Sequence, residues 1–243
     1  MANTHSIDLE LSSSQYLSIA DGDQTGLDLT TDFTLEIWIK LEQLPSTIGD
    51  SVALIGKDGA AGDRSWACKL TSANKLSIFY VADNDATNYT FIESTSAIVV
   101  AGDVGSWVHI AVSVDISAKT AVMYKNSSSV DDTVVTANST TSVGSTAPFR
   151  IGTNRAADSD FFDGLIDEVR IWSDIRTSTE ISDNYEKELV GTETGLVGYW
   201  QLNNDLLDQT SNDNDLTNNN SATFSTDVPF VEATNTGAFF QMF

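Results

Sequence analysis

The sequence predicts an all-β protein, an antiparallel sandwich with one short helix. Two segments, Asp32–Lys40 and Phe161–Trp172, alternate large apolar residues with polar ones, and a period of two is typical of a strand with one buried face. Short runs of this kind recur at intervals of about ten residues between clusters of Gly, Asn, Asp and Ser, as in β-sandwiches. The exception is residues 178–190, where Thr177 or Ser178 can cap the first turn of a helix.

The alternation assigns side chains to faces within these two strands. In the first, Phe33, Leu35, Ile37 and Ile39 share one side. In the second, we expect two opposed sets, one of Leu165, Asp167, Val169 and Ile171 and the other of Ile166, Glu168, Arg170 and Trp172. Further along, residues 195–202 are typical of a last core strand, and the Asn- and Asp-rich residues 203–220 are expected to form an ordered loop at the rim of the sandwich.

Composition narrows the classes of function. The chain has 243 residues, of which 41% are hydrophobic, enough for one sizeable core. The formal net charge is −23, from 35 acids against 12 bases, which argues against binding to nucleic acids or other polyanions. The single cysteine, Cys68, rules out an intrachain disulfide framework and is interpreted as a small core residue. No apolar run is long enough to span a bilayer, and the start of the chain lacks a signal-peptide pattern.

Several fragments, in order, resemble one known family. They are Tyr16–Asp21, Asp32–Lys40, Ala53–Asp58, Trp107–Asp115 followed by Thr120–Asn126, Phe149–Gly152 and Phe161–Trp172. Together they resemble the laminin G-like, pentraxin-related branch of the concanavalin A-like lectin/glucanase superfamily, which implies an antiparallel jelly-roll sandwich. Two turns depart from the family pattern, Asn126-Ser127 and Ser12-Ser13, so we expect both to be rebuilt.

The residues argue against catalysis. Glycoside hydrolysis needs two carboxylates about 5–10 Å apart across the bond, and the E-x-D-x-x-E pattern of the glucanase relatives is absent. Asp167 and Glu168 are adjacent and are expected on opposite faces, while Asp158 and Asp160 stand in a loop-like run. Of the two histidines, His109 lies within a strand pattern and is interpreted as structural. We therefore predict a protein that is not an enzyme.

The resemblance implies two alternative sites for a structural Ca²⁺ ion, which takes six to eight oxygen ligands. One is Asp167, at the position of a calcium-binding aspartate in the glucanase relatives. The other joins Asp58 to Asn154, Asp158 and Asp160, as in the pentraxin-like relatives. Solvated turn residues are the alternative interpretation for both, since Asn and Asp favour turns.

Sugar binding needs an aromatic surface beside polar loop residues. Trp38, Trp172 and Trp200 stand in strongly patterned strands and are expected to pack in the interior. The candidates for ligand binding in loops are Tyr80, Asp83, Asn84, Tyr89 and Arg155.

The last residues differ from the rest of the chain. We predict one domain over residues 1–231 and an aromatic tail over residues 232–243 that docks on a partner or a neighbouring subunit rather than folding back on its own sheet. The docking residues are Phe239, Phe240, Met242 and Phe243. Pro229 makes a central strand unsuitable at this point.

Two classes of function remain open. One is a phage virion component on the outside of the particle, a capsid decoration or surface-attachment protein that binds other virion subunits or itself and, in addition, cell-surface glycans. The other is an extracellular bacterial carbohydrate-binding module, and a glycoside hydrolase is a third class. The lack of a signal-peptide pattern and the aromatic tail favour the first.

Overall fold

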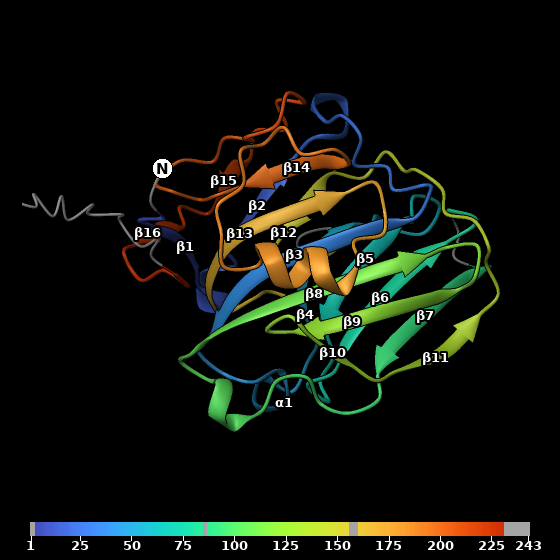
Figure 1. Cartoon of the computed structure of the whole chain (residues 1–243), viewed down its shortest axis with the longest axis horizontal. Coiled ribbons are helices and arrows are strands. Elements are labelled where there is room, and N and C mark those ends of the chain that lie inside the picture. Colours follow the sequence, from blue (N-terminus) through green and yellow to red (C-terminus); the bar gives the residue numbers. More distant parts are fainter. Residues whose placement is uncertain (1–2, 85–86, 156–159, 231–243) are drawn as a thin grey trace, which may run out of the picture.

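The computed structural model describes residues 3–84, 87–155 and 160–230 of the chain. Its strands form two antiparallel sheets that pack face to face (Figure 1). Sheet A contains, in spatial order, β10 (Ser128–Val130), β9 (Thr120–Lys125), β8 (Trp107–Asp115), β3 (Phe33–Leu41), β13 (Gly164–Trp172), β1 (Ser6–Leu9) and β16 (Thr223–Ser225), and β14 (Leu196–Trp200) also pairs with β13. Sheet B contains β11 (Asp132–Ala137), β7 (Tyr89–Ser94), β6 (Leu76–Val81), β5 (Trp66–Leu70), β4 (Val52–Lys57), β12 (Phe149–Ile151), β2 (Tyr16–Ile19) and β15 (Thr217–Asn219). The predicted jelly-roll sandwich is confirmed.

The inner faces of the two sheets form the core. Trp66, Phe149 and Trp200 lie in line there, with ring centroids 6.2 Å and 5.2 Å apart, and all three are fully buried. Trp38 and Trp172 are buried as predicted, but they lie on the outer face of sheet A. There the ring of Trp38 stacks on Tyr185, and the Trp172 Nε1–H donates to Glu36 at 2.7 Å.

A β-bulge in β13 changes the predicted alternation. Asp167 pairs with Trp38 and Arg170 with Glu36, so β13 has one residue more than β3 over this stretch. Glu168 absorbs it with a left-handed backbone, φ 49°. Ile166 and Val169 point into the core, whereas Asp167, Glu168 and Arg170 all lie on the outer side. The expectation that Asp167 and Glu168 occupy opposite faces is wrong, because a strict period of two does not continue through a bulge.

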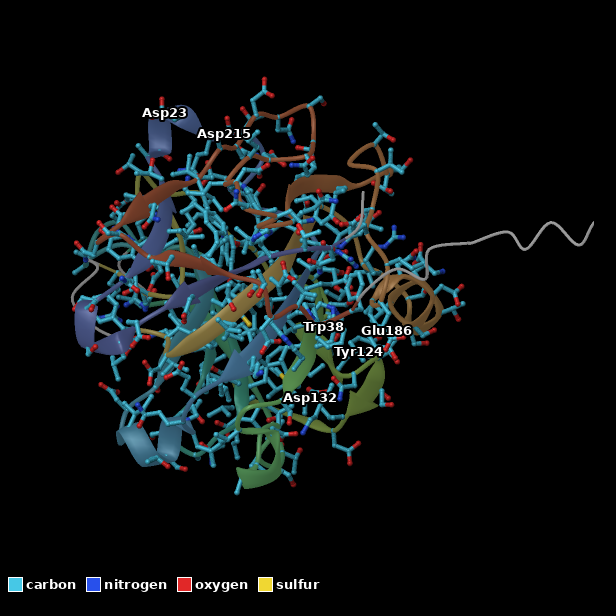
Figure 2. All side chains as sticks on the ribbon, turned by 90° about the vertical axis from the view of Figure 1, so that its left-hand side faces the viewer. Asp23, Trp38, Tyr124, Asp132, Glu186 and Asp215 are labelled. Atoms are coloured by element: carbon cyan, nitrogen blue, oxygen red, sulfur yellow. The ribbon has the colours of Figure 1, made fainter. Side chains whose placement is uncertain are left out.

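The predicted helix is shorter than expected. α2 (Ser178–Asn184) is capped by Thr177, whose side chain accepts from the Glu180 N–H while the Glu180 side chain accepts from the Thr177 N–H. Ile181 packs on the outer face of sheet A. The helix ends at Asn184 and not at residue 190. Beyond it, backbone carbonyls turn toward the sheet and accept hydrogen bonds from Trp38 and Arg170. Figure 2 shows Trp38 and Tyr124 beside this helix.

The short helices and loops complete the fold. The other helices in the described residues are α1 (Pro45–Ile48) and three 3₁₀ turns, at Leu11–Ser13, Asp21–Asp23 and Ala101–Asp103. Asn126 and Ser127, one of the two turns expected to be rebuilt, form a two-residue hairpin turn with φ of 48° and 63°. The expected rim loop is ordered around Asp208, which accepts from the N–H groups of Tyr199, Thr210 and Asn214. Within the described residues, no helix is long and apolar enough to cross a membrane.

Candidate functional site

A groove of about 470 Å³ runs over the outer face of sheet B. Its floor is a row of residues that pair across four neighbouring strands. The row runs Ala67, Phe79, Phe91 and Thr136 on β5, β6, β7 and β11. The floor is aromatic at the centre and ends at the small side chain of Ala67, which pairs with Gly56 on β4. A Cβ atom at Gly56 would already lie 3.2 Å from the Ala67 Cβ.

Aromatic rings line the central part of this groove. Phe79 and Phe91 are adjacent across strands, and Tyr89 lies two residues before Phe91 on the same face of β7. The rings of Phe79 and Tyr89 have centroids 5.5 Å apart at an angle of 45°. All three side chains are partly exposed. They therefore present apolar surface with a hydroxyl at one edge, which suits the apolar face of a sugar ring.

Two arginines share one buried carboxylate at the end of the groove. Asp58 follows β4, and its carboxylate lies 2.5 Å from the Nε of Arg64 and 3.6 Å from the Nε of Arg155. The Asp58 side chain is 1% exposed, whereas those of Arg64 and Arg155 are 15% and 49% exposed. The Arg64 guanidinium also lies 4.8 Å from the centroid of the Phe79 ring, a cation–π contact. Asp58 thus fixes both guanidinium groups beside the aromatic floor.

A second ion pair forms another part of the wall. Lys69 points outward from β5 into the groove, and its Nζ lies 2.5 Å from the carboxylate of Asp160. The backbone carbonyl of Asp160 accepts from the Ala53 N–H on β4. These contacts hold Asp160, in the segment before β13, beside sheet B.

The structure separates the predicted ligand-binding residues. Tyr89 and Arg155 line the groove. Asp83 and Asn84 lie in the loop after β6 and bind neighbouring loops. The Asn84 amide donates to the carbonyls of Arg64 and Gly144, and Asp83 accepts from the N–H and hydroxyl of Thr87.

The prediction for Tyr80 is wrong. Tyr80 lies in β6 and not in a loop, and its side chain is fully buried between the sheets. Its hydroxyl donates to the carbonyl of Ile116 at 3.4 Å. Because adjacent residues of a strand point to opposite faces, the neighbouring Phe79 faces the groove instead.

The four-residue calcium site does not fit the described side chains. Asp58 is held by Arg64 and Arg155, and Asp160 by Lys69, so cationic groups already neutralise both acids. The Asn154 amide is buried and hydrogen-bonds to no group in the described part of the chain, but it brings no charge. Asp158 lies outside the described residues, as do the predicted docking residues of the tail.

The second predicted calcium position, Asp167, stays a prediction. Asp167 accepts from the Asn3 amide at 2.9 Å and from the Glu168 N–H at 2.9 Å. Burial, and next the negative charge of Glu168, hold the pKa of Asp167 well above its usual value. The Asn3 Oδ1 is buried beside this pair and accepts from no described group. A cation here would gain two oxygen ligands, Asp167 and Asn3 Oδ1, and would favour ionised Asp167.

A polar cluster is buried beneath α2 and the segment after it. Arg170 pairs with Glu168 at 2.7 Å and lies 3.8 Å from Glu36. Glu36 in turn lies 3.3 Å from His109, and the Tyr199 hydroxyl donates to Glu168. Burial lowers the pKa of His109 despite the neighbouring carboxylate, and burial raises the pKa of Glu168 to about 7, against the opposing charge of Arg170. The structural interpretation of His109 agrees with this packing.

One acidic cluster was not predicted. Carboxylate oxygens of Asp8, Glu10 and Glu42 lie within 4.8 Å of one another near the ends of β1 and β3, the two strands that flank the start of β13. The pKa of Asp8 is raised, mainly by burial and to a lesser extent by the negative charge of Asp163. The pKa of Glu42 is also raised, first by partial burial and next by the charges of Glu10, Asp163 and Asp8. Asp8 and Glu10 stand at the end of β1 and Glu42 follows β3, so the spacing of the three acids in the sequence does not indicate a cluster.

Comparisons with known proteins agree with this architecture. A family model described as the concanavalin A-like lectin/glucanases superfamily matches residues 11–182. A candidate carbohydrate binding protein from Bacteroides ovatus has a TM-score of 0.66 at 17% identity. The match covers 95% of this chain and 62% of that chain. A heptameric SAP-like pentraxin from Limulus polyphemus has a TM-score of 0.63 at 12% identity, with coverage of 93% and 97%.

At these identities the solved structures show a shared fold. The chain spans only 62% of the length of the Bacteroides protein. A search of curated proteins gave no match. The family model, however, covers well over half of the sequence. The chain belongs to the concanavalin A-like lectin/glucanases superfamily.

Proposed function

We propose that the protein binds a carbohydrate, without cleaving it, in the groove on the outer face of sheet B. The observation that carries the proposal is the set of partly exposed rings of Phe79, Tyr89 and Phe91 next to the guanidinium groups of Arg64 and Arg155. Aromatic faces pack against the C–H face of a sugar, and side chains with several N–H donors bind its hydroxyls. The family includes lectins, and one structural neighbour is a candidate carbohydrate binding protein.

The dimensions of the groove suit a short oligosaccharide. Its volume of about 470 Å³ falls in the range of roughly 300–1,000 Å³ that is typical of small-molecule sites. The rings of the floor stand on paired strands. Because backbone hydrogen bonds fix these strands, the side chains need little ordering when a ligand binds.

The carboxylates of the groove support binding over hydrolysis. Among the described lining residues Asp58 is the single acid, and it is buried against Arg64. Asp160, nearby, is paired with Lys69. A glycosidase needs one carboxylic acid and one carboxylate on either side of the bond, and neither of these ion-paired groups is placed to exchange protons with a ligand.

The test is a glycan array followed by calorimetric titration of the glycans that bind. Tyr89→Ala should weaken binding at least tenfold, because it removes a ring from the ligand surface while Arg64 keeps its contact with Phe79. Tyr16→Ala is the matched control, since Tyr16 is a partly exposed tyrosine of the same sheet, on β2, outside the groove. Unchanged affinity in Tyr89→Ala, or release of reducing sugars by the wild type, would contradict the proposal.

A role on a phage particle stays a prediction. Groove binding is compatible with both a surface-attachment protein of a virion and an extracellular bacterial module. Genes for capsid, portal or tail proteins next to the gene for this chain would support the first.

A further inference from the structure

We infer that the groove selects acidic sugars, and specifically sugars that carry a carboxylate group. The inference rests on the proposed function, because it names the class of ligand for the same site. It goes against the charge of the molecule as a whole, which is −23.

The groove has the opposite charge balance from the rest of the chain. Its described lining residues include three bases, Arg64, Lys69 and Arg155, and one acid, Asp58, although acids outnumber bases by 35 to 12 in the chain. Lys69 is matched by Asp160. Among the described residues, Arg64 and Arg155 pair with Asp58 alone, so within this part of the chain two guanidinium groups share one carboxylate at this end of the groove.

The geometry makes the charge of these guanidinium groups available to a ligand. Both arginines approach Asp58 through Nε, and no described residue accepts a hydrogen bond from their terminal amino groups. Asp58 is 1% exposed and Arg155 is 49% exposed, so a ligand meets the guanidinium groups and not the acid that positions them. The planar guanidinium group pairs with a carboxylate through two parallel N–H···O bonds.

The surrounding charge limits the size of the ligand. Outside the groove the acidic surface repels anions over about one Debye length, ~8 Å at physiological ionic strength. A long polyanion would lie across that surface, whereas a short oligosaccharide with one or two carboxylates can place them on the arginines. The groove therefore suits a short or terminal uronic acid unit, with its ring on Phe79 and Tyr89.

The experiment compares oligogalacturonides with their methyl esters by calorimetric titration at 150 mM salt. These two probes have the same backbone and differ in charge. We expect the wild type to bind the free acid about tenfold more tightly than the ester, the effect of one charge-assisted contact. Arg155→Gln should weaken binding of the free acid about tenfold more than binding of the ester, and so remove that preference. Lys187→Gln, which removes an exposed lysine near sheet A, is the charge-matched control and should keep it.

The outcomes separate this inference from the proposed function. If ester and acid bind equally and both lose affinity in Tyr89→Ala, the groove binds sugars but the charge selection is wrong. If Tyr89→Ala changes nothing, the proposed function is wrong and the inference falls with it. Equal loss of preference in Arg155→Gln and Lys187→Gln would mean that net charge, not the arginine pair, sets the selectivity, which also overturns the inference. Tighter binding of a sulfated oligosaccharide than of the uronide would overturn the choice of a carboxylate.

Discussion

Glu168 makes the stability of this fold depend on pH. It lies at the β13 bulge, fully buried, with its carboxylate bound by Arg170 and Tyr199. Burial raises its pKa from 4.5 to about 7, although Arg170 opposes the shift. In the folded state it therefore keeps a proton that the unfolded chain releases above pH 4.5.

The sign and size of the effect follow from proton linkage. Between pH 4.5 and 7 the folded protein binds more protons than the unfolded chain, so the free energy of unfolding falls as the pH rises. The contribution is fully present below pH 4.5 and lost by about pH 7. The shift of about 2.5 in pKa corresponds to roughly 3 kcal/mol.

Glu168→Gln should remove this part of the pH dependence. Urea unfolding at pH 5 and pH 8 gives the free energy of unfolding of each protein, and the change between the two pH values should be smaller in the variant by about 2.5 kcal/mol, because part of the contribution is already lost at pH 5. A constant loss of stability at both pH values, from the broken Arg170 contact, does not affect the comparison. His109, with a lowered pKa, acts in the opposite direction because its contribution is lost as the pH falls below 6.5. An identical pH dependence in wild type and variant would refute the reasoning.

Three further predictions follow from other parts of the structure. Glu42→Gln should raise the free energy of unfolding by roughly a few tenths of a kcal/mol, and the melting temperature slightly, because it relieves repulsion from Asp8 and Glu10. A lower melting temperature, restored by a divalent cation, would indicate a bound ion instead. We propose that Ca²⁺ binds beside Asp167. EDTA should then lower the melting temperature of the wild type but not that of Asp167→Asn. An equal response of the two proteins would contradict the proposal. A chain ending at Val231 should stay folded, since it keeps the hydrogen bonds that the Asp227 carboxylate accepts from Lys40 and Trp107. Loss of the cooperative unfolding transition would place the aromatic tail within the domain.

The alternation of apolar and polar residues was enough to predict the strands, and it also identifies the side chains that face the groove. In Leu76-Ser-Ile-Phe-Tyr80, the apolar set Leu76, Ile78 and Tyr80 shares one face, which leaves Phe79 with Ser77 on the other. An aromatic residue on the polar face of a strand is the signal that identifies Phe79, and the same reasoning applies to Phe91 beside Glu93. By the same alternation Tyr80 belongs to the buried face, so the prediction that it binds ligand in a loop is wrong.

Other features depend on contacts between distant residues and could not be predicted. The end of α2 is set by Trp38, 147 positions away from its partner carbonyl at Tyr185. The pairing of Asp58 with Arg155 joins the end of β4 to the loop after β12. The bulge at Glu168 depends on the pairing of β13 with β3. Each needs the registration of the sheets, which local propensity does not determine.

The two outer faces of the sandwich differ in how far they are covered, and this difference indicates where the candidate site lies. The outer face of sheet A is covered by α2 and by the residues that follow it, which bury Arg170, Glu168 and Glu36 (Figures 1 and 2). Both terminal amino groups of Arg170 donate within the fold, to Glu168 and to the backbone carbonyls of Asn184 and Lys187. Across β5, β6 and β7 no described segment covers the outer face of sheet B, and there aromatic and cationic side chains are partly exposed. Polar groups committed to the fold stabilise it, whereas those with unused donors can recognise a ligand. Arg64 and Arg155 differ from Arg170 in this respect, and for that reason we assign recognition to sheet B.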